Sequence, residues 1–159
     1  SVHQGGANEL AVHARTKREG YKAPAHWEYV DAIRHALPIP VTANGEIWDH
    51  ADALACAQVS GCDTLMVGRG AISLPNLANV MKTGCAHMSW AEVLQLMVSY
   101  TEQDLASEKA DYYPSRIKQW FSYLKREYPE ADRLFGEIRV LKETHPIRDA
   151  LLQASKTVI

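Results

Sequence analysis

The sequence lacks the segments that would take a chain into or across a membrane. No apolar run in its 159 residues approaches the roughly 20 residues needed to span a bilayer, and no signal-peptide pattern opens it. Only three cysteines are present, Cys56, Cys62 and Cys85, and none of them forms a CxxC pair. An odd number without paired spacing favours free, mostly buried thiols in a reducing compartment. We therefore expect a cytoplasmic protein with no membrane partner and no metal site.

An excess of positive charge is also missing. The chain has 17 basic and 19 acidic residues and a net charge of −2 with His neutral, so its overall charge gives no case for binding nucleic acid. Its 47% of apolar and 23% of charged residues are typical of globular proteins and exclude disorder, collagen and coiled coils. One segment departs from this balance: residues 112–126 contain Arg116, Lys118, Lys125 and Arg126 and no carboxylate.

Residues 1–84 show a repeated strand–helix pattern. Short apolar segments alternate with segments of helical periodicity, which is typical of parallel strands that are covered on both faces. Strands are predicted at 10–14, 39–43 and 64–67, and helices at 27–37 and 50–60. Asp49 is a plausible N-cap of the second helix and Gly61 its C-terminal stop. A closed (β/α)8 barrel takes about 250 residues, so we expect only part of one, with exposed sheet edges.

The same argument predicts that the chain begins partway through a fold. Nothing upstream of the first predicted strand supplies another strand or a complete helix. An exposed part of a sheet favours self-association of this chain, although the sequence fixes no stoichiometry.

Polar loops follow all three predicted strands, and those after the last two strands bear glycine. They lie at 13–17, 44–46 and 68–70. Sites in α/β proteins lie at the carboxyl ends of strands, where glycine lets backbone N–H groups approach a phosphate and Arg69 adds a cation. Each glycine alone could be a tight turn, but three at equivalent positions indicate a site. His13 could still be a structural residue and Glu46 only a residue of the helix entry.

Residues 85–159 are predicted to form four short helices with short connections, which is typical of a four-helix bundle. Ser89 and Glu92 have the spacing of a capping box, and proline marks the starts of the later helices. The helices are predicted to begin at Ser89, Tyr113, Pro129 and Pro146, with a break at 109–111 after the first.

The second of these helices has basic side chains on both flanks of an apolar stripe. At roughly 100° per residue, Arg116 and Tyr123 fall on one flank and Lys118 falls on the other. A solvated helix face usually mixes charge signs, so this pattern favours phosphate contacts and stacking by Tyr123 on a base or sugar. The alternative is a solvated basic face beside a core.

Three segments, in this order and spacing, resemble the tRNA-dihydrouridine synthase family. They are V-H-A-R-T-K at 12–17 with G-Y at 20–21, P-V-T-A-N-G-E-I at 40–47, and M-V-G-R-G-A at 66–71. The segment R-I-K-Q-W-F-S-Y-L at 116–124 is similar to the C-type subfamily, which acts on the uridine at position 16 of tRNA. The resemblance covers nearly the whole chain.

The resemblance implies a flavoenzyme of mixed architecture, α/β followed by all-α. Residues 1–84 would be the last three βα units of an FMN-binding TIM barrel, the catalytic domain, and residues 85–159 a helical tRNA-recognition domain. Members reduce a uridine of tRNA to 5,6-dihydrouridine, with NADPH as the reductant that recharges FMN. The partner is tRNA, and the full-length enzyme is expected to be a monomer.

The resemblance also assigns residues. Those matching FMN-binding positions are Asn44, Gly45, Glu46, Gly68 and Arg69, with His13 near the isoalloxazine ring. Those matching tRNA-contacting positions are Tyr21, Arg116, Lys118, Tyr123 and Arg139. Tyr21 could instead pack on its own loop, and Arg139 could pair with Glu137 or Glu143.

One part of the family pattern is missing. The catalytic cysteine of the family lies in an N-G-C-P-type loop, which has no counterpart here, and the family's flavin-contacting lysine is also absent. We therefore expect this polypeptide alone to be inactive and the full-length protein to be active. Two alternatives stay open: a non-catalytic tRNA-binding helical module on a barrel remnant, and a different phosphate-binding barrel enzyme.

Overall fold

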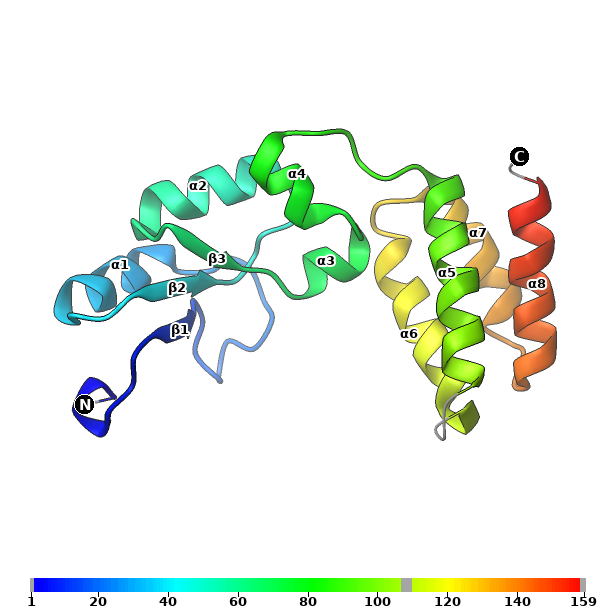
Figure 1. Ribbon diagram of the computed structural model, residues 1–159, viewed down its shortest axis with the longest axis horizontal. Coiled ribbons are helices and arrows are strands. Elements are labelled where there is room, and N and C mark those ends of the chain that lie inside the picture. The colour runs from blue at the N-terminus through cyan, green and yellow to red at the C-terminus, as the bar shows by residue number, and fades with distance from the viewer. Residues whose placement is uncertain (1, 107–109, 158–159) are drawn as a thin grey trace. The chain divides into compact units, whose positions relative to one another are not determined.

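The computed structural model describes residues 2–106 and 110–157, which form two compact units (Figure 1). Unit 1 runs to Ala71 and includes Asn76–Ala86, whereas unit 2 contains Ile72–Pro75 and the chain from His87 onward. Each unit is described by itself. The functional division into a catalytic domain at 1–84 and a tRNA-recognition domain at 85–159 stays a prediction.

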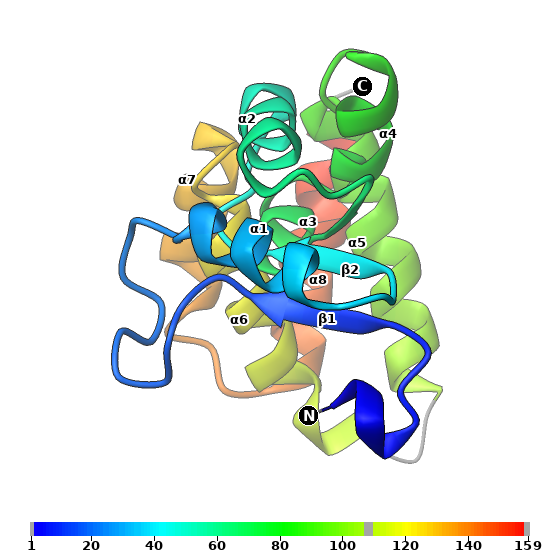
Figure 2. The ribbon, with the colours of Figure 1, turned by 90° about the vertical axis from the view of Figure 1, so that its left-hand side faces the viewer.

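Unit 1 is built on a three-stranded parallel sheet with strand order β1-β2-β3. The strands are β1 (Leu10–His13), β2 (Val41–Asn44) and β3 (Thr64–Met66), connected by α1 (Trp27–Ala36) and α2 (His50–Ser60). The two helices pack on each other and on the same face of the sheet (Figures 1 and 2). The predicted strands and helices are confirmed, with ends that differ by at most two residues.

Only one face of this sheet is covered within the described residues. Val41 and Ala43 of β2 are buried against Val30 of α1 and Cys56 of α2, and these residues belong to the core of unit 1. The opposite face carries exposed side chains, such as His13. The expectation of strands covered on both faces is therefore wrong for this part of the chain. The expected exposed edges are present, because β1 and β3 each pair on one side only.

Local signals explain where α2 begins and ends. The Asp49 side chain accepts a hydrogen bond from the Asp52 backbone N–H at 2.8 Å, and Gly61 follows the helix with φ 63°. A residue without Cβ adopts this left-handed conformation at little cost. The unpredicted elements of the first 86 residues are short: η1 (His3–Gly5), α3 (Arg69–Ser73) and α4 (Leu77–Thr83).

Unit 2 is helical. Its elements are α5 (Trp90–Leu105), η2 (Ala110–Tyr112), α6 (Tyr113–Leu124), α7 (Pro129–Ile138) and α8 (Thr144–Thr157). The predicted capping box is present, since the Ser89 side chain accepts from the Glu92 backbone and the Glu92 side chain accepts from that of Ser89. α8 begins two residues before the predicted Pro146, which its first turn tolerates because the first N–H groups of a helix lack intrahelical partners. The predicted break at 109–111 lies partly outside the described residues.

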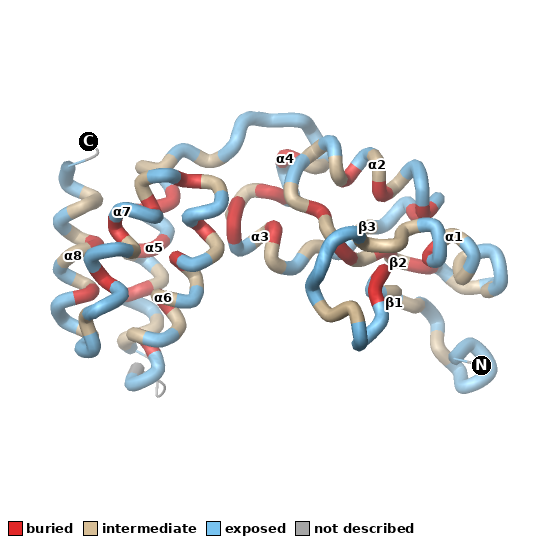
Figure 3. The backbone as a smooth tube through the Cα atoms, turned by 180° about the vertical axis from the view of Figure 1, so that it is seen from behind, coloured by how far each residue is buried: buried red, intermediate tan, exposed pale blue. Residues whose placement is uncertain are grey.

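Apolar stripes hold these helices together. α5 packs on α8, α6 on α7, and α7 on α8. Buried residues recur along each helix (Figure 3). The fully buried side chains include Met97, Phe121, Ile138 and Ile147. A buried hydrogen bond of 2.9 Å between the hydroxyls of Thr101 and Tyr113 also joins α5 to α6. Within residues 2–106 and 110–157, no helix is long and apolar enough to cross a membrane.

Candidate functional site: a pocket at the strand ends

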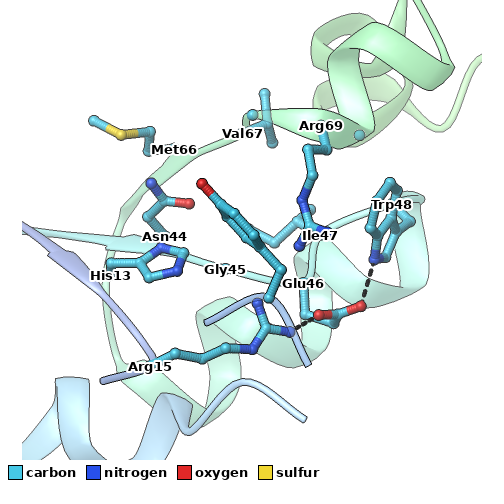
Figure 4. Close-up of a pocket in the computed structure, with 13 residues that line it drawn as sticks. His13, Arg15, Asn44, Gly45, Glu46, Ile47, Trp48, Met66, Val67 and Arg69 are labelled. Carbon is cyan, nitrogen blue, oxygen red and sulfur yellow. Dashed lines mark hydrogen bonds and ion pairs between the residues drawn. The ribbon is translucent and has the colours of Figure 1, made fainter. Parts of the chain in front are cut away.

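A pocket of about 390 Å³ opens at the carboxyl ends of the three strands (Figure 4). Its lining contains all the residues predicted to hold the cofactor, together with Tyr21: His13, Asn44, Gly45, Glu46, Gly68 and Arg69. Six further lining residues were not assigned to the cofactor, although Arg15 and Gly70 lie in the predicted site loops 13–17 and 68–70: Arg15, Ile47, Trp48, Met66, Val67 and Gly70. The expectation that the three loops meet at one edge of the sheet is met by this geometry.

The sheet register explains why these side chains meet. His13 pairs with Asn44, and Asn44 pairs with Met66, so the last residues of the three strands form one row. Residues in one row across parallel strands project from the same face of a sheet. Because α1 and α2 cover the other face, the row lines the pocket.

The turn after β2 has an unusual backbone. Gly45 has φ 136° and Glu46 has φ 56°, and Glu46 is the one non-glycine residue with positive φ in the described chain. The Gly45 carbonyl accepts a hydrogen bond from Trp27 Nε1 at 2.8 Å, which ties the turn to α1. Non-glycine residues in this conformation cost free energy and persist only where the surroundings hold them.

Glu46 is held by two side chains. Its carboxylate forms an ion pair with Arg15, and its Oε1 accepts a hydrogen bond from Trp48 Nε1 at 2.8 Å (Figure 4). The Arg15 side chain is fully buried and also donates from Nε to the Pro24 carbonyl at 3.2 Å. Glu46 therefore joins the loop after β1 to the loop after β2.

The electrostatics of the pocket favour an anion. Burial lowers the pKa of Arg15, and the positive charge of Arg69 lowers it further, whereas Glu19 opposes the shift. Arginine stays protonated in proteins despite such shifts. Two guanidinium groups thus face a pocket with one lining carboxylate, Glu46, and a negatively charged ligand would relieve their repulsion.

Arg69 is placed by aromatic rings. Its Cζ lies 4.5 Å from the centroid of the Tyr21 ring and 5.2 Å from that of the Trp48 ring. Within residues 2–106 and 110–157, the Arg69 side chain makes no hydrogen bond or ion pair. Its five N–H donors are therefore available to a ligand.

Gly68 and Gly70, which follow β3, differ in the space around them. A Cβ at Gly70 would lie 2.3 Å from the Ile47 carbonyl oxygen, so the close packing of two loops excludes a side chain there. A Cβ at Gly68 would have no neighbour within 4 Å, so its backbone is open to the pocket. An open glycine backbone beside a free guanidinium fits a phosphate group.

Of the residues predicted to contact tRNA, only Tyr21 lines this pocket, and the others belong to unit 2. Arg116 of α6 pairs with Asp104 of α5 at 2.7 Å, and this hydrogen-bonded partner raises the pKa of Arg116. Lys118 donates a hydrogen bond to the Leu141 carbonyl. The sequence of α6 itself contains no carboxylate. The neighbouring helix α5, however, places the carboxylate of Asp104 beside Arg116.

The remaining predicted contacts differ in exposure. Tyr123 is half-buried, whereas Arg139 is exposed and its side chain has neither a hydrogen bond nor an ion pair within the described chain. Its suggested partners, Glu137 and Glu143, are thus not engaged by it. The assignment of these residues to tRNA stays a prediction.

The cysteines are not part of the pocket. Cys56 and Cys62 are buried free thiols, and Cys85 is an exposed one. Burial raises the pKa of Cys56 to about 11, which keeps it protonated and unreactive at neutral pH. No group of three His, Cys, Asp or Glu residues suited to a metal occurs in the part of the chain that the structure describes.

Sequence reasoning missed Trp48 as a lining residue, and it missed the ion pair that Arg15, within the predicted loop 13–17, forms with Glu46. Arg15 lies within the segment 12–17 that resembles the family, and Trp48 directly follows the segment 40–47. Their positions next to recognised motifs are the only signal that could have found them.

The fold and pocket define an α/β protein built from consecutive βα units, with an open pocket at its strand ends, and sequence comparison identifies its family. The chain belongs to the dihydrouridine synthase (Dus) family, whose profile matches residues 1–155. It is 61% identical over 154 residues to the tRNA-dihydrouridine(16) synthase of Shewanella oneidensis, covering 97% of this chain and 49% of that protein. Its three parallel strands and connecting helices fit part of a TIM barrel.

Other proteins with the same name are also similar. The tRNA-dihydrouridine(16) synthase of Vibrio cholerae is 52% identical over 95% of this chain and 47% of that protein. The corresponding values for the protein of Escherichia coli K12 are 47% identity, 95% and 48%. The chain thus spans about half the length of the curated relatives that it matches.

Proposed function

We propose that the complete protein containing this chain is an FMN-dependent tRNA-dihydrouridine synthase that reduces uridine 16 of tRNA. The observation that carries the proposal is the pocket at the strand ends, with Gly68 and Arg69 beside the row formed by His13 and Asn44. The relatives' names support the reaction and its position in tRNA.

The pocket residues fit FMN in three parts. Arg69 and the open backbone at Gly68 would bind the phosphate, because the Arg69 N–H groups have no partner in the described chain and the space beside Gly68 is empty. Asn44, Gly45 and Glu46 would hold the ribityl chain, and the exposed His13 would lie beside the isoalloxazine ring. Bound FMN would supply the hydride that reduces the uracil ring, and NADPH would restore it.

The target base must leave the tRNA stack before it can enter such a pocket. His13 and Asn44 lie on the open sheet face, where an extruded base could approach. Transfer of a proton to the uracil carbon needs a general acid, and the described cysteines lie outside the pocket. We infer that the N-G-C-P-type loop of the complete protein supplies this acid, and that the 159-residue chain alone is inactive.

We further propose that the chain corresponds to the last three βα units of the barrel followed by a four-helix bundle that recognises tRNA. Arg139 offers an exposed cation without a partner in the described chain, and Tyr123 offers a half-buried ring. Arg116 and Lys118 would contact phosphates while keeping their contacts with Asp104 and the Leu141 carbonyl.

The test is tRNA reduction by the complete protein. It is incubated with NADPH and an unmodified tRNA transcript, and dihydrouridine is located by mass spectrometry of nuclease fragments. We expect the fragment containing position 16 to gain two hydrogen atoms. Retained tRNA binding without reduction would instead support the non-catalytic tRNA-binding module.

A further inference from the structure

The guanidinium of Arg69 lies against two aromatic rings, of which Trp48 has no assigned role and Tyr21 only an expected contact with tRNA. Tyr21 and Trp48 approach its Cζ to 4.5 Å and 5.2 Å, both within the roughly 6 Å over which a cation is attracted to a ring face. A cation held over a ring face is attracted by the ring without donating an N–H group to a nitrogen or oxygen acceptor, so its hydrogen-bonding capacity stays available to a ligand.

Trp48 is itself fixed. Its Nε1 donates to Glu46 at 2.8 Å, and Glu46 is paired with the fully buried Arg15 (Figure 4). The ring is half-buried in the pocket wall, so it offers Arg69 a rigid surface. Tyr21 is different, because it is 72% exposed and comes from the long loop between β1 and α1.

We propose that Trp48 and Tyr21 are positioning residues that hold the Arg69 guanidinium for the phosphate of the flavin, an inference that rests on the proposed function. A free arginine side chain loses rotamer entropy when it binds a ligand, whereas an arginine held by two rings has lost much of it beforehand. The two rings therefore strengthen binding of the phosphate without touching it.

This role predicts a specific pattern of ligand dependence. Riboflavin has the same ring and ribityl chain as FMN but no phosphate. Replacing Trp48 by Leu removes the ring face and should weaken FMN binding roughly tenfold while changing riboflavin binding less than about twofold. Trp48→Phe keeps a ring face and should keep most of the preference for FMN over riboflavin.

The experiment titrates the flavin-free complete protein with FMN and with riboflavin, following flavin fluorescence, for wild type, Trp48→Leu, Trp48→Phe and Tyr21→Leu. Tyr112→Leu is the matched control for Tyr21→Leu, because Tyr112 is 65% exposed and lies outside the pocket. Thermal unfolding of each variant checks that it is folded. The same substitutions are repeated in an Arg69→Ala background, where the FMN/riboflavin affinity ratio should no longer respond to Trp48→Leu.

The outcomes distinguish a failure of the proposed function from a failure of the positioning role. A wild-type protein that binds neither flavin overturns the proposed function itself. A wild type that prefers FMN, with an unchanged FMN/riboflavin ratio in Trp48→Leu, overturns the positioning role alone. Equal losses of affinity for FMN and riboflavin would overturn the positioning role, and so would an undiminished effect of Trp48→Leu in the Arg69→Ala background. Either result would mean that Trp48 supports the pocket as a whole.

Discussion

At the residue scale, Glu46 connects the separate parts of the pocket. It has positive φ, pairs with the buried Arg15 and accepts a hydrogen bond from Trp48. The Arg15 side chain is fully buried, whereas that of Glu46 is 24% exposed. Arg15 therefore relies on the ion pair more than Glu46 does, because only the arginine side chain has lost its access to water.

Glu46→Gln should destabilise unit 1 by about 2 kcal/mol, because it leaves a buried guanidinium without its counter-charge. The glutamine can still accept the hydrogen bond from Trp48. The loss of stability therefore measures the effect of removing the negative charge. Urea unfolding of the purified protein measures it. The double variant Arg15→Met with Glu46→Gln should recover most of the stability, and a double variant less stable than Glu46→Gln would contradict this interpretation of the pair.

The predictable residues of the pocket are those whose position follows from a strand end. His13, Asn44 and Arg69 lie at or just after the predicted strands, and parallel strands end at one edge of a sheet. The position of Arg15 follows from the predicted loop 13–17 in the same way, but its ion pair with Glu46 does not, and neither does the place of Trp48, since both depend on contacts between different loops. The pairing of Arg116 with Asp104 was missed for the same reason.

At the element scale, hydrogen bonds at the start of α5 give its stability a defined pH dependence. Hydrogen bonds from Ser89 lower the pKa of Glu92 below its ordinary value. A lowered folded-state pKa stabilises the protein fully above the unfolded-state pKa, near pH 4.5, and the contribution is lost as pH falls through the folded-state pKa.

Glu92→Gln should therefore reduce the loss of stability between about pH 6 and about pH 3, relative to wild type. Thermal unfolding followed by circular dichroism across this range measures the difference. Glu102→Gln is the matched control, because Glu102 is an exposed glutamate near the other end of α5. Identical pH profiles for wild type and Glu92→Gln would show that the capping box does not contribute to the pH dependence of stability.

The start of α3 gives a second comparison, between Gly68, just before this helix, and Gly70 within its first turn. Gly70→Ala should destabilise the protein by about 1–3 kcal/mol, because the new Cβ would collide with the Ile47 carbonyl. Gly68→Ala should change stability by less than about 0.5 kcal/mol but weaken FMN binding, because its Cβ has space only until a phosphate occupies it. Urea unfolding and flavin titration of both variants test the pair, and a reversed order of stabilities would contradict it.

Most elements could be predicted because their ends carry strong local signals. Asp49 and Gly61 bound α2, and Ser89 with Glu92 begins α5. α3 and α4 were missed because five and seven residues are too few for helical periodicity to appear in the sequence. α8 was predicted two residues late, because proline is accepted at several positions of a first turn.

At the scale of the whole molecule, the chain spans about half the length of its curated relatives and its sheet has two unpaired edges within the described residues. Reduction of tRNA is therefore a property that we propose for the complete protein. The contribution that we propose for unit 2 is recognition of tRNA, which can be tested separately from the chemistry.

Arg116→Ala combined with Lys118→Ala should weaken tRNA binding by the complete protein and reduce the slope of log affinity against log salt by about two phosphate contacts. Both side chains also support unit 2, through Asp104 and the Leu141 carbonyl. Asp104→Asn is therefore the matched control: it weakens the same contact between helices, keeps both cations and should leave the salt slope unchanged. An unaltered slope in the double variant would remove these residues from the RNA interface.

The central claim is that the strand ends of unit 1 hold the phosphate of a flavin, and the most direct measurement is the absorbance spectrum of the purified complete protein. We expect wild type to retain a flavin band through gel filtration and Arg69→Ala to lose it, because this substitution removes the free guanidinium of the pocket. A colourless wild type that takes up no added FMN, or an Arg69→Ala variant with undiminished flavin, would contradict the account.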